Sequence, residues 1–379
     1  MSDYPIIQWS EAGKECSARW RSESGLPPPK RVILADDKLS AKDAFRLACE
    51  GTALLWRGDF FNARQLLEAM ARRADHKPLK PRKPASSANE AFHLHRRDQA
   101  QRSRILGMLL LSFESDYTLK LRRAPDVKQA CEEVYGPKKT EPFVTSLREL
   151  LGLVGAHEWR KKGINITAID GRIHPHYGIF APVRNEYVTL VAEAPLAPSV
   201  KLAFDIGTGT GVLAAVLAHR GVSRIVATDQ EPRALVCARE NLTRLGFSNQ
   251  VEVVKANLFP EGRAPLIVCN PPWIPVKPSS PLEFAIYDPE SAMLTGFLNG
   301  LADHLTPGGE GWLILSDIAE HLGLRSREQL LAAFENANLN VIDKIDIRPH
   351  HPRTTDVNDP LHLARKAEVT SLWRLAAKQ

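Results

Sequence analysis

One tetrapeptide in this chain combines an amide, two prolines and an aromatic ring: Asn270, Pro271, Pro272 and Trp273. It follows a short apolar run, residues 266–269, that predicts a buried strand. The Asn270 amide oxygen and a nearby backbone carbonyl can accept both hydrogen bonds of a planar –NH2 group. The prolines keep the loop rigid and the ring can stack on the target, which indicates catalysis by positioning a nitrogen. The alternative is a Pro-rich turn with a core Trp.

A glycine-rich turn lies upstream of this motif. Residues 201–206 predict a buried strand, and Gly207, Thr208, Gly209 and Gly211 follow directly, before a helical stretch. Strand, glycine turn and helix form the first unit of a doubly wound sheet, and glycines let the backbone approach a ligand closely. Such a turn also occurs in dinucleotide sites, but the Gly-x-Gly-x-Gly spacing differs from the Gly-x-Gly-x-x-Gly of the nicotinamide fingerprint.

An acidic residue ends the next predicted strand, residues 224–228. Asp229 at this position can accept hydrogen bonds from both hydroxyls of a ribose. The alternative is a solvated Asp at a strand end. Ligands of such sheets lie at the carboxyl ends of the strands, and Asp205, Asn257 and Asn270 also fall at or near predicted strand ends.

With these residues in this order, the chain resembles the class I S-adenosylmethionine (SAM) methyltransferases of the Asn-Pro-Pro-aromatic branch. Within this branch it is similar to the HemK-type glutamine N-methyltransferases, and related small-domain enzymes methylate guanine or adenine in RNA. The resemblance covers roughly residues 163–375. It is carried by residues 204–211, 227–229, 270–275 and 305–309, with residues 287–290 similar to the family's helix entry after the motif loop.

The resemblance implies SAM as the cofactor. Two positions depart from the family pattern: Trp273 stands where HemK enzymes usually have Tyr, and Asn257 where the family usually has Asp near the adenine ring. An Asn can still form hydrogen bonds with the adenine edge. The cofactor-binding residues that we expect are Asp205, Gly207, Thr208, Gly209, Gly211, Asp229, Gln230, Asn257, Leu258 and Asn270.

Residues of the acceptor pocket are also implied by the resemblance. HemK-type enzymes have a Pro-Arg-Pro-Glu-Thr-like segment that lines the SAM and substrate pocket. Pro182, Arg184 and Glu186 match it here, while Asn185 replaces the second Pro. Together with Trp273 they form the predicted substrate-binding set. The alternative is an ordinary helix cap with surface charges.

These observations predict an α/β fold: a seven-stranded, doubly wound, Rossmann-like methyltransferase sheet with a mainly helical N-terminal domain. The last strand, residues 369–375, is expected to insert antiparallel, as the resemblance implies. We expect residues 1–163 to form a basic accessory or substrate-recognition domain. Residues 164–379 then form the methyltransferase domain, in which residues 164–195 are a connecting hairpin and helix.

Composition limits the class of protein. No apolar run approaches the roughly 20 residues that span a bilayer, and residues 1–20 lack a signal-peptide pattern, so we expect a cytoplasmic protein without membrane contact. The five cysteines are scattered without a Cys-x-x-Cys pair, which argues against zinc and disulfides. The pairs His93/His95 and His174/His176 have the spacing of some metal ligands but no third ligand, so no metal is expected.

Charge is divided unevenly along the chain. Residues 1–163 carry a net charge of +9 and residues 164–379 a net charge of −3, which together give the +6 of the whole chain. A basic domain beside a mildly acidic one is typical of proteins with a polyanionic partner such as RNA. The alternative is a solvated face that only serves solubility.

The leading hypothesis is a SAM-dependent N-methyltransferase that acts on a planar –NH2 nitrogen of a macromolecule, either a protein glutamine or an RNA base. A second hypothesis is a small-molecule methyltransferase whose N-terminal domain serves as a lid or dimer interface. The third is a non-catalytic nucleic-acid-binding protein that keeps SAM structurally, against which the intact tetrapeptide at Asn270 argues. No oligomeric state is predicted.

Overall fold

The computed structural model describes residues 4–75, 85–137, 141–349 and 356–378. The chain divides into two compact units. The N-terminal unit comprises Met1–Pro84 and His93–Glu158, and the C-terminal unit comprises Ala85–Phe92 and Trp159–Gln379. The boundary predicted from the sequence lies at residue 163, whereas in this division Ala85–Phe92 and Trp159–Gly163 belong to the C-terminal unit.

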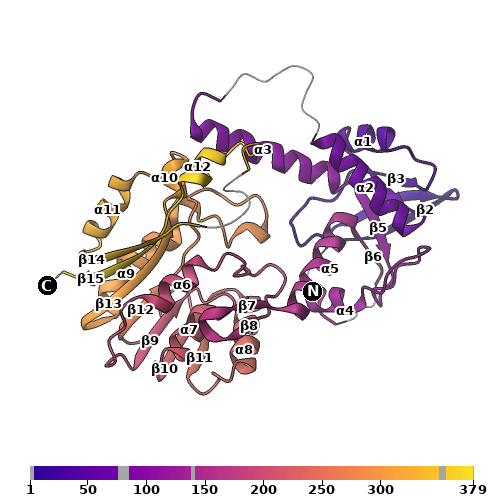
Figure 1. The fold of residues 1–379 in the computed structure, drawn as a ribbon. Helices are drawn as coiled ribbons and strands as arrows, with labels where there is room; N and C mark the ends of the chain where they lie inside the picture. Colours follow the sequence, from indigo (N-terminus) through magenta and orange to yellow (C-terminus); the bar gives the residue numbers. More distant parts are fainter. Residues whose placement is uncertain (1–3, 76–84, 138–140, 350–355, 379) are drawn as a thin grey trace. The chain divides into compact units, whose positions relative to one another are not determined.

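The C-terminal unit is built on a seven-stranded sheet with the strand order β11-β10-β9-β12-β13-β15-β14 (Figure 1). The last strand of the chain, β15, lies between β13 and β14 and is antiparallel to both. The predicted doubly wound sheet and its inserted last strand are therefore confirmed. The strands are β9 (Leu202–Ile206), β10 (Arg224–Asp229), β11 (Val251–Lys255), β12 (Ala264–Cys269), β13 (Leu305–Ser316), β14 (Leu339–Ile347) and β15 (Thr370–Ala377).

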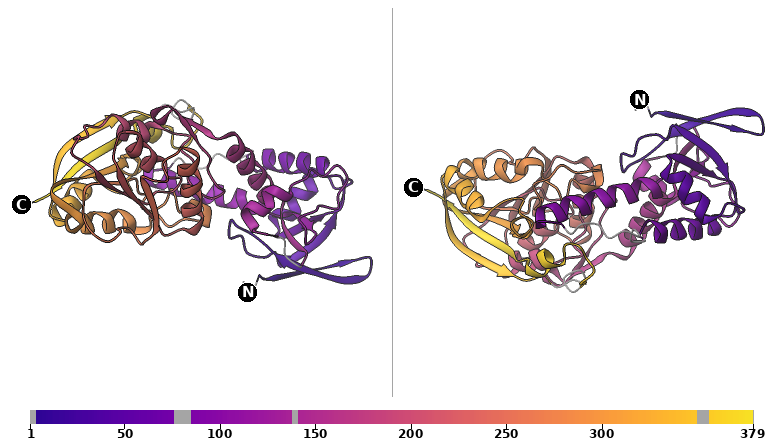
Figure 2. Two further views of the ribbon diagram at one scale, coloured as in Figure 1. Left: turned by 90° about the horizontal axis from the view of Figure 1, so that it is seen from below. Right: turned by 90° about the horizontal axis from the view of Figure 1, so that it is seen from above.

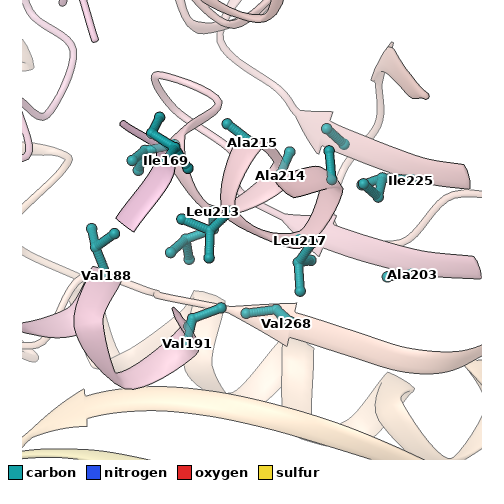
Figure 3. Close-up of a cluster of buried hydrophobic side chains, with 14 of the residues drawn as sticks. Ile169, Val188, Val191, Ala203, Leu213, Ala214, Ala215, Leu217, Ile225 and Val268 are labelled. Carbon is teal, nitrogen blue, oxygen red and sulfur yellow. The ribbon is translucent and has the colours of Figure 1, made fainter. Parts of the chain in front are cut away.

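Helices cover both faces of this sheet, as two further views show (Figure 2). The side chains of β9 alternate between the faces: Ala203 joins one apolar cluster and Phe204 the other. Figure 3 shows the first cluster, in which Leu213 and Val191 gather with Val268 of β12. The first face carries α6 (Glu186–Glu193), α7 (Val212–His219) and α8 (Pro232–Arg244), and the second carries α9 (Ala292–His304) and α11 (Arg327–Asn336).

The predicted hairpin before this sheet is present as the antiparallel pair β7 (Ile164–Ile166) and β8 (Gly171–Ile173). The histidines after it have local partners: the His174 ring contacts the Arg160 carbonyl and the His176 ring contacts Glu240. Within the described residues, no group of three potential metal ligands is found. In the same part of the chain, no helix has the length and apolar character needed to cross a bilayer.

The N-terminal unit contains a six-stranded sheet with the order β1-β2-β6-β5-β4-β3. This sheet corrects the expectation of a mainly helical domain. Some of its strands, such as β4, are short apolar runs that periodicity alone does not distinguish from buried helix segments: all five residues of β4 are buried. The strands are β1 (Ile6–Glu11), β2 (Lys14–Trp20), β3 (Arg31–Ala35), β4 (Thr52–Trp56), β5 (Leu109–Phe113) and β6 (Phe143–Ser146). The helices are α1 (Ala41–Cys49), α2 (Phe60–Ala74), α3 (Ala88–Leu106), α4 (Lys128–Tyr135) and α5 (Leu147–Lys162), of which α3 and α5 extend into the C-terminal unit.

Candidate active site

Strand register brings the predicted site residues to one edge of the C-terminal sheet. Ile206 of β9 pairs with Cys269 of β12 on one side and with Thr228 of β10 on the other. Because paired residues of neighbouring parallel strands lie about 4.8 Å apart, the residues that follow them leave the sheet side by side. Gly207 therefore lies between Asp229 and Asn270. All three are at the carboxyl ends of the strands, which is where doubly wound sheets bind their ligands.

The backbone of the glycine turn is held by the side chain of Asp205. Its carboxylate, only 1% exposed, accepts hydrogen bonds from the Thr208 hydroxyl at 2.6 Å and from the Ala214 N–H at 3.1 Å. Burial raises the pKa of Asp205 to about 6, against the lowering effect of these two donors. Asp205 thus ties the strand end to the first turn of α7 and fixes the backbone of the turn.

Two of the glycines have different roles. Gly211, at φ +81°, packs so closely on α8 that an added Cβ would lie 3.2 Å from Ala238 Cα. Gly209, at φ +54°, is less crowded, because the nearest heavy atom to an added Cβ is Ile179 Cγ2 at 4.0 Å. The turn is therefore tightly packed against α8 at Gly211 and has more room at Gly209, which suits a ligand that must approach the backbone.

Asp229 joins the turn to the second strand. Its Oδ2 accepts a hydrogen bond from the Gly209 N–H at 3.0 Å, and its Oδ1 accepts one from the Glu231 N–H at 2.9 Å. Burial raises the pKa of this carboxyl group. A carboxylate has about four acceptor positions, so Asp229 retains capacity for ribose hydroxyls.

The remaining predicted cofactor residues flank this edge. Gln230 is exposed directly after Asp229, and Asn257 is exposed after β11. Leu258 has a positive φ of 72°, and its carbonyl accepts the Thr228 hydroxyl at 2.6 Å. A glycine turn, a carboxylate at the next strand end and an exposed amide at the third fit a nucleoside cofactor such as SAM.

The Asn-Pro-Pro-Trp loop contains an internal hydrogen bond that the sequence analysis missed. The indole Nε1–H of Trp273 donates to Oδ1 of Asn270 at 2.9 Å. Pro271 is buried, and Pro272 and Trp273 are half-buried. The Trp273 ring packs against apolar clusters of both sheet faces. The loop is thus a rigid element, and Asn270 presents its oxygen rather than its –NH2 group to Trp273.

The chain after the motif is anchored by Asp288. Its N–H donates to the Ile274 carbonyl at 2.8 Å, and its carboxylate accepts the N–H groups of Met293 and Leu294 at 2.9 and 3.0 Å. Asp288 is 5% exposed, and burial raises its pKa. Asp288 therefore holds the motif loop through its backbone N–H and the start of α9 through its side chain, in the segment predicted from the sequence to be the helix entry.

The predicted substrate-binding segment also reaches the motif. Arg184 places its guanidinium carbon 5.8 Å from the centre of the Trp273 ring. It donates through Nη2 to Glu368 at 3.1 Å and lies 3.9 Å from Glu186. Pro182, two residues before Arg184, is buried. The structure thus brings Arg184 to the Trp273 ring, with Glu186 beside Arg184.

Glu368 and Ser316 are site residues that the sequence analysis missed. Glu368, 3% exposed, accepts the Ser316 hydroxyl at 2.8 Å through the same oxygen that binds Arg184. Ser316 ends β13 and Glu368 precedes β15, so a charge pair from distant parts of the chain supports the motif. In the sequence, this pair is indicated only by a Glu that stands next to a strand expected to be buried.

The side chains at this edge can position a ligand nitrogen. Asn270 offers an amide oxygen and Trp273 a flat ring beside the glycine turn. Within the described residues, no His or Cys lies in this group of side chains, and the Cys269 thiol is fully buried in the sheet with its pKa raised by burial. The arrangement suits a nucleophile that needs orientation.

Comparison with known proteins places this edge within a known domain type. A family model described as the methyltransferase small domain matches residues 171–344. The release factor glutamine methyltransferase of Cereibacter sphaeroides is 33% identical over 171 residues, 41% of this chain and 60% of that protein. The tRNA1(Val) (adenine(37)-N6)-methyltransferase of Bacteroides fragilis is 30% identical over 166 residues, 39% of this chain and 69% of that protein.

This chain spans less than two thirds of the length of several curated relatives that it matches: 60% and 44% of two release factor glutamine methyltransferases and 22% of a ribosomal protein L11 methyltransferase. A solved structure, the ribosomal protein L11 methylase of Lactobacillus delbrueckii subsp. bulgaricus, is similar over 55% of this chain and 87% of its own, with 18% identity and a TM-score of 0.38.

Proposed function

Since this chain belongs to the SAM-dependent methyltransferases with a methyltransferase small domain, we propose that it methylates a planar –NH2 nitrogen of a macromolecule. The acceptor that we propose is a protein glutamine or an RNA base. Both present a flat, conjugated nitrogen whose two N–H groups lie in one plane. The relatives described above are named for a glutamine and for an adenine N6 acceptor.

The observation that carries this proposal is the position of Asn270. It follows Cys269, which pairs with Ile206, so its amide lies beside the glycine turn where the cofactor is proposed to bind. Trp273 occupies one acceptor position of its oxygen, and the second is left for an incoming N–H. The Pro271 carbonyl is the proposed acceptor for the other N–H of the same group.

In the proposed mechanism, SAM supplies an electrophilic methyl group, and the protein residues provide the geometry. The glycine turn and Asp229 hold the cofactor, while Asn270 and Pro271 hold the two N–H groups so that the nitrogen lone pair points toward the methyl carbon. A nitrogen–carbon bond forms as the sulfur–carbon bond breaks. The nitrogen becomes more acidic on methylation, so its proton leaves to solvent and no strong base is required.

Residues 1–163, which contain the N-terminal unit, are proposed to recognise the acceptor. Residues 1–163 carry a net charge of +9, and residues 164–379 carry −3. Positive charge on the part of the chain outside the methyltransferase fold supports an acidic partner, such as RNA or the ribosome.

The experiment is a methyl-transfer assay with labelled SAM against RNA, ribosomes and total protein from cells that lack the gene. Mass spectrometry then locates the added methyl group. Asn270→Ala is expected to bind SAM nearly as the wild type does in calorimetry and to lose methyl transfer. If the label appears only in small molecules, or if Asn270→Ala loses activity solely in proportion to lost SAM binding, the proposal is wrong.

A further inference from the structure

The indole N–H of Trp273 has a use that its stacking role does not explain. It lies 2.9 Å from Asn270 Oδ1, within one turn of the motif loop. The two ends of an Asn amide are nearly the same in shape but opposite in chemistry, because one accepts hydrogen bonds and the other donates them. An indole N–H only donates, so it stabilises the orientation in which Oδ1 faces the ring.

The orientation of this amide matters for the proposed function, on which the inference rests. If the Asn270 amide turned over, its –NH2 group would face the N–H groups of the acceptor. Two donors would then oppose each other, and no hydrogen bond would hold the target nitrogen. The acceptor position of Oδ1 that Trp273 leaves free is available only in the orientation that the structure shows.

The Trp273 ring is itself held by charged and apolar neighbours. The Arg184 guanidinium lies 5.8 Å from the ring centre and is paired with Glu368, which is 3% exposed and also bound to Ser316. Apolar clusters on both faces of the sheet contact the same ring. Because the ring cannot turn freely, its N–H remains directed at Asn270.

We propose that Trp273 is a positioning residue whose indole N–H locks the Asn270 amide with its oxygen ready for the acceptor –NH2 group. A tyrosine or phenylalanine at this position stacks equally well but has no donor at the place of the indole nitrogen. The lock is therefore a property of the Trp in this chain, separate from the contribution of its flat face.

A double-mutant cycle tests this proposal in the full-length protein. Trp273→benzothienylalanine replaces the indole N–H by sulfur at nearly constant shape, so stacking is kept and only the donor is lost. We expect kcat to fall about tenfold, which corresponds to the loss of one hydrogen bond, while the calorimetric Kd for SAM stays within about twofold. In the Asn270→Asp background, whose carboxylate has no –NH2 end to misplace, the same replacement is expected to change kcat by less than about threefold.

Nuclear magnetic resonance provides a readout that does not depend on knowing the acceptor. The Nε1–H signal of Trp273, assigned by its loss in Trp273→Phe, is expected to move upfield in Asn270→Ala, and the Trp312 indole signal, whose donor binds Glu310 instead, is expected not to move. Equal losses of kcat in the wild-type and Asn270→Asp backgrounds, or an unchanged Trp273 signal, would overturn the lock. A failure of the proposed function appears differently, as a wild-type protein that methylates no macromolecule while the resonance shift is still seen.

Discussion

The Asp229 carboxylate accepts a hydrogen bond from the Gly209 backbone N–H at 3.0 Å, which joins the end of β10 to the glycine turn after β9. The same carboxylate is the proposed partner of the cofactor ribose. One side chain therefore shapes the turn and is proposed to bind the ligand, so we expect its loss to affect both.

We predict that Asp229→Ala weakens SAM binding by about 10- to 100-fold, because hydrogen bonds to a charged group contribute about 1.5–3 kcal/mol. Isothermal titration calorimetry measures this directly. Asp303→Ala, which removes an exposed carboxylate of α9 away from the strand ends, is the control and is expected to bind SAM as the wild type does. Equal affinities of Asp229→Ala and Asp303→Ala would remove Asp229 from the cofactor site.

Asp205 predicts a specific pH dependence of stability. Burial raises its pKa to about 6 from the ordinary value of 3.8, so the folded protein holds a proton here that the unfolded chain releases near pH 4. The contribution of Asp205 to the free energy of unfolding is therefore fully present below about pH 4 and is lost as the pH rises through about 6. The total loss is at most about 3 kcal/mol.

The measurement compares urea denaturation of the wild type and Asp205→Asn at several values between pH 4 and pH 7. The difference in unfolding free energy between the two proteins is expected to shift in favour of the variant as the pH rises through this window. Above about pH 7 the difference is expected to be constant. A difference that is flat across the window would show that Asp205 has an ordinary pKa.

Alanine substitutions at Gly211 of the glycine turn and at Gly221, which both have a positive φ, are expected to lower stability by different amounts. Gly211→Ala adds a Cβ 3.2 Å from the Ala238 backbone, whereas Gly221→Ala, at φ +89°, adds one in open space. The strain of a left-handed residue costs about 1–2 kcal/mol in both. We therefore expect Gly211→Ala to lower the unfolding free energy by about 1 kcal/mol more than Gly221→Ala does in urea denaturation; equal losses would mean that α8 moves away without cost.

The sequence predicted the strand ends of the C-terminal sheet better than the side-chain contacts around them. The apolar runs before Asn270 and Asp229 predict both a strand and the residue at which it ends. Because the strands are parallel, their ends then lie at the same edge of the sheet. The Asn270–Trp273 hydrogen bond depends on a side-chain direction that spacing does not specify. Glu368 reaches Arg184 only because β15 inserts between β13 and β14. The sheet of the N-terminal unit was missed in part because strands such as β4 are as short and apolar as pieces of a buried helix.

The ion pair between Glu368 and Arg184 predicts an effect on both stability and acceptor binding. Glu368→Gln keeps the size of the side chain but removes its charge beside Arg184 in a buried place, so we expect the unfolding free energy to fall by about 1–3 kcal/mol. Because Arg184 lies over Trp273, we also expect the acceptor KM to rise several-fold while SAM affinity is unchanged. The matched control is Glu335→Gln, which breaks an ion pair with Lys378 whose Glu side chain is 77% exposed, and which is expected to change stability by less than about 0.5 kcal/mol. If both variants unfold at the same urea concentration and have wild-type KM values, the Glu368–Arg184 pair does not support the motif loop, and the Trp273 ring must be held by its apolar neighbours alone.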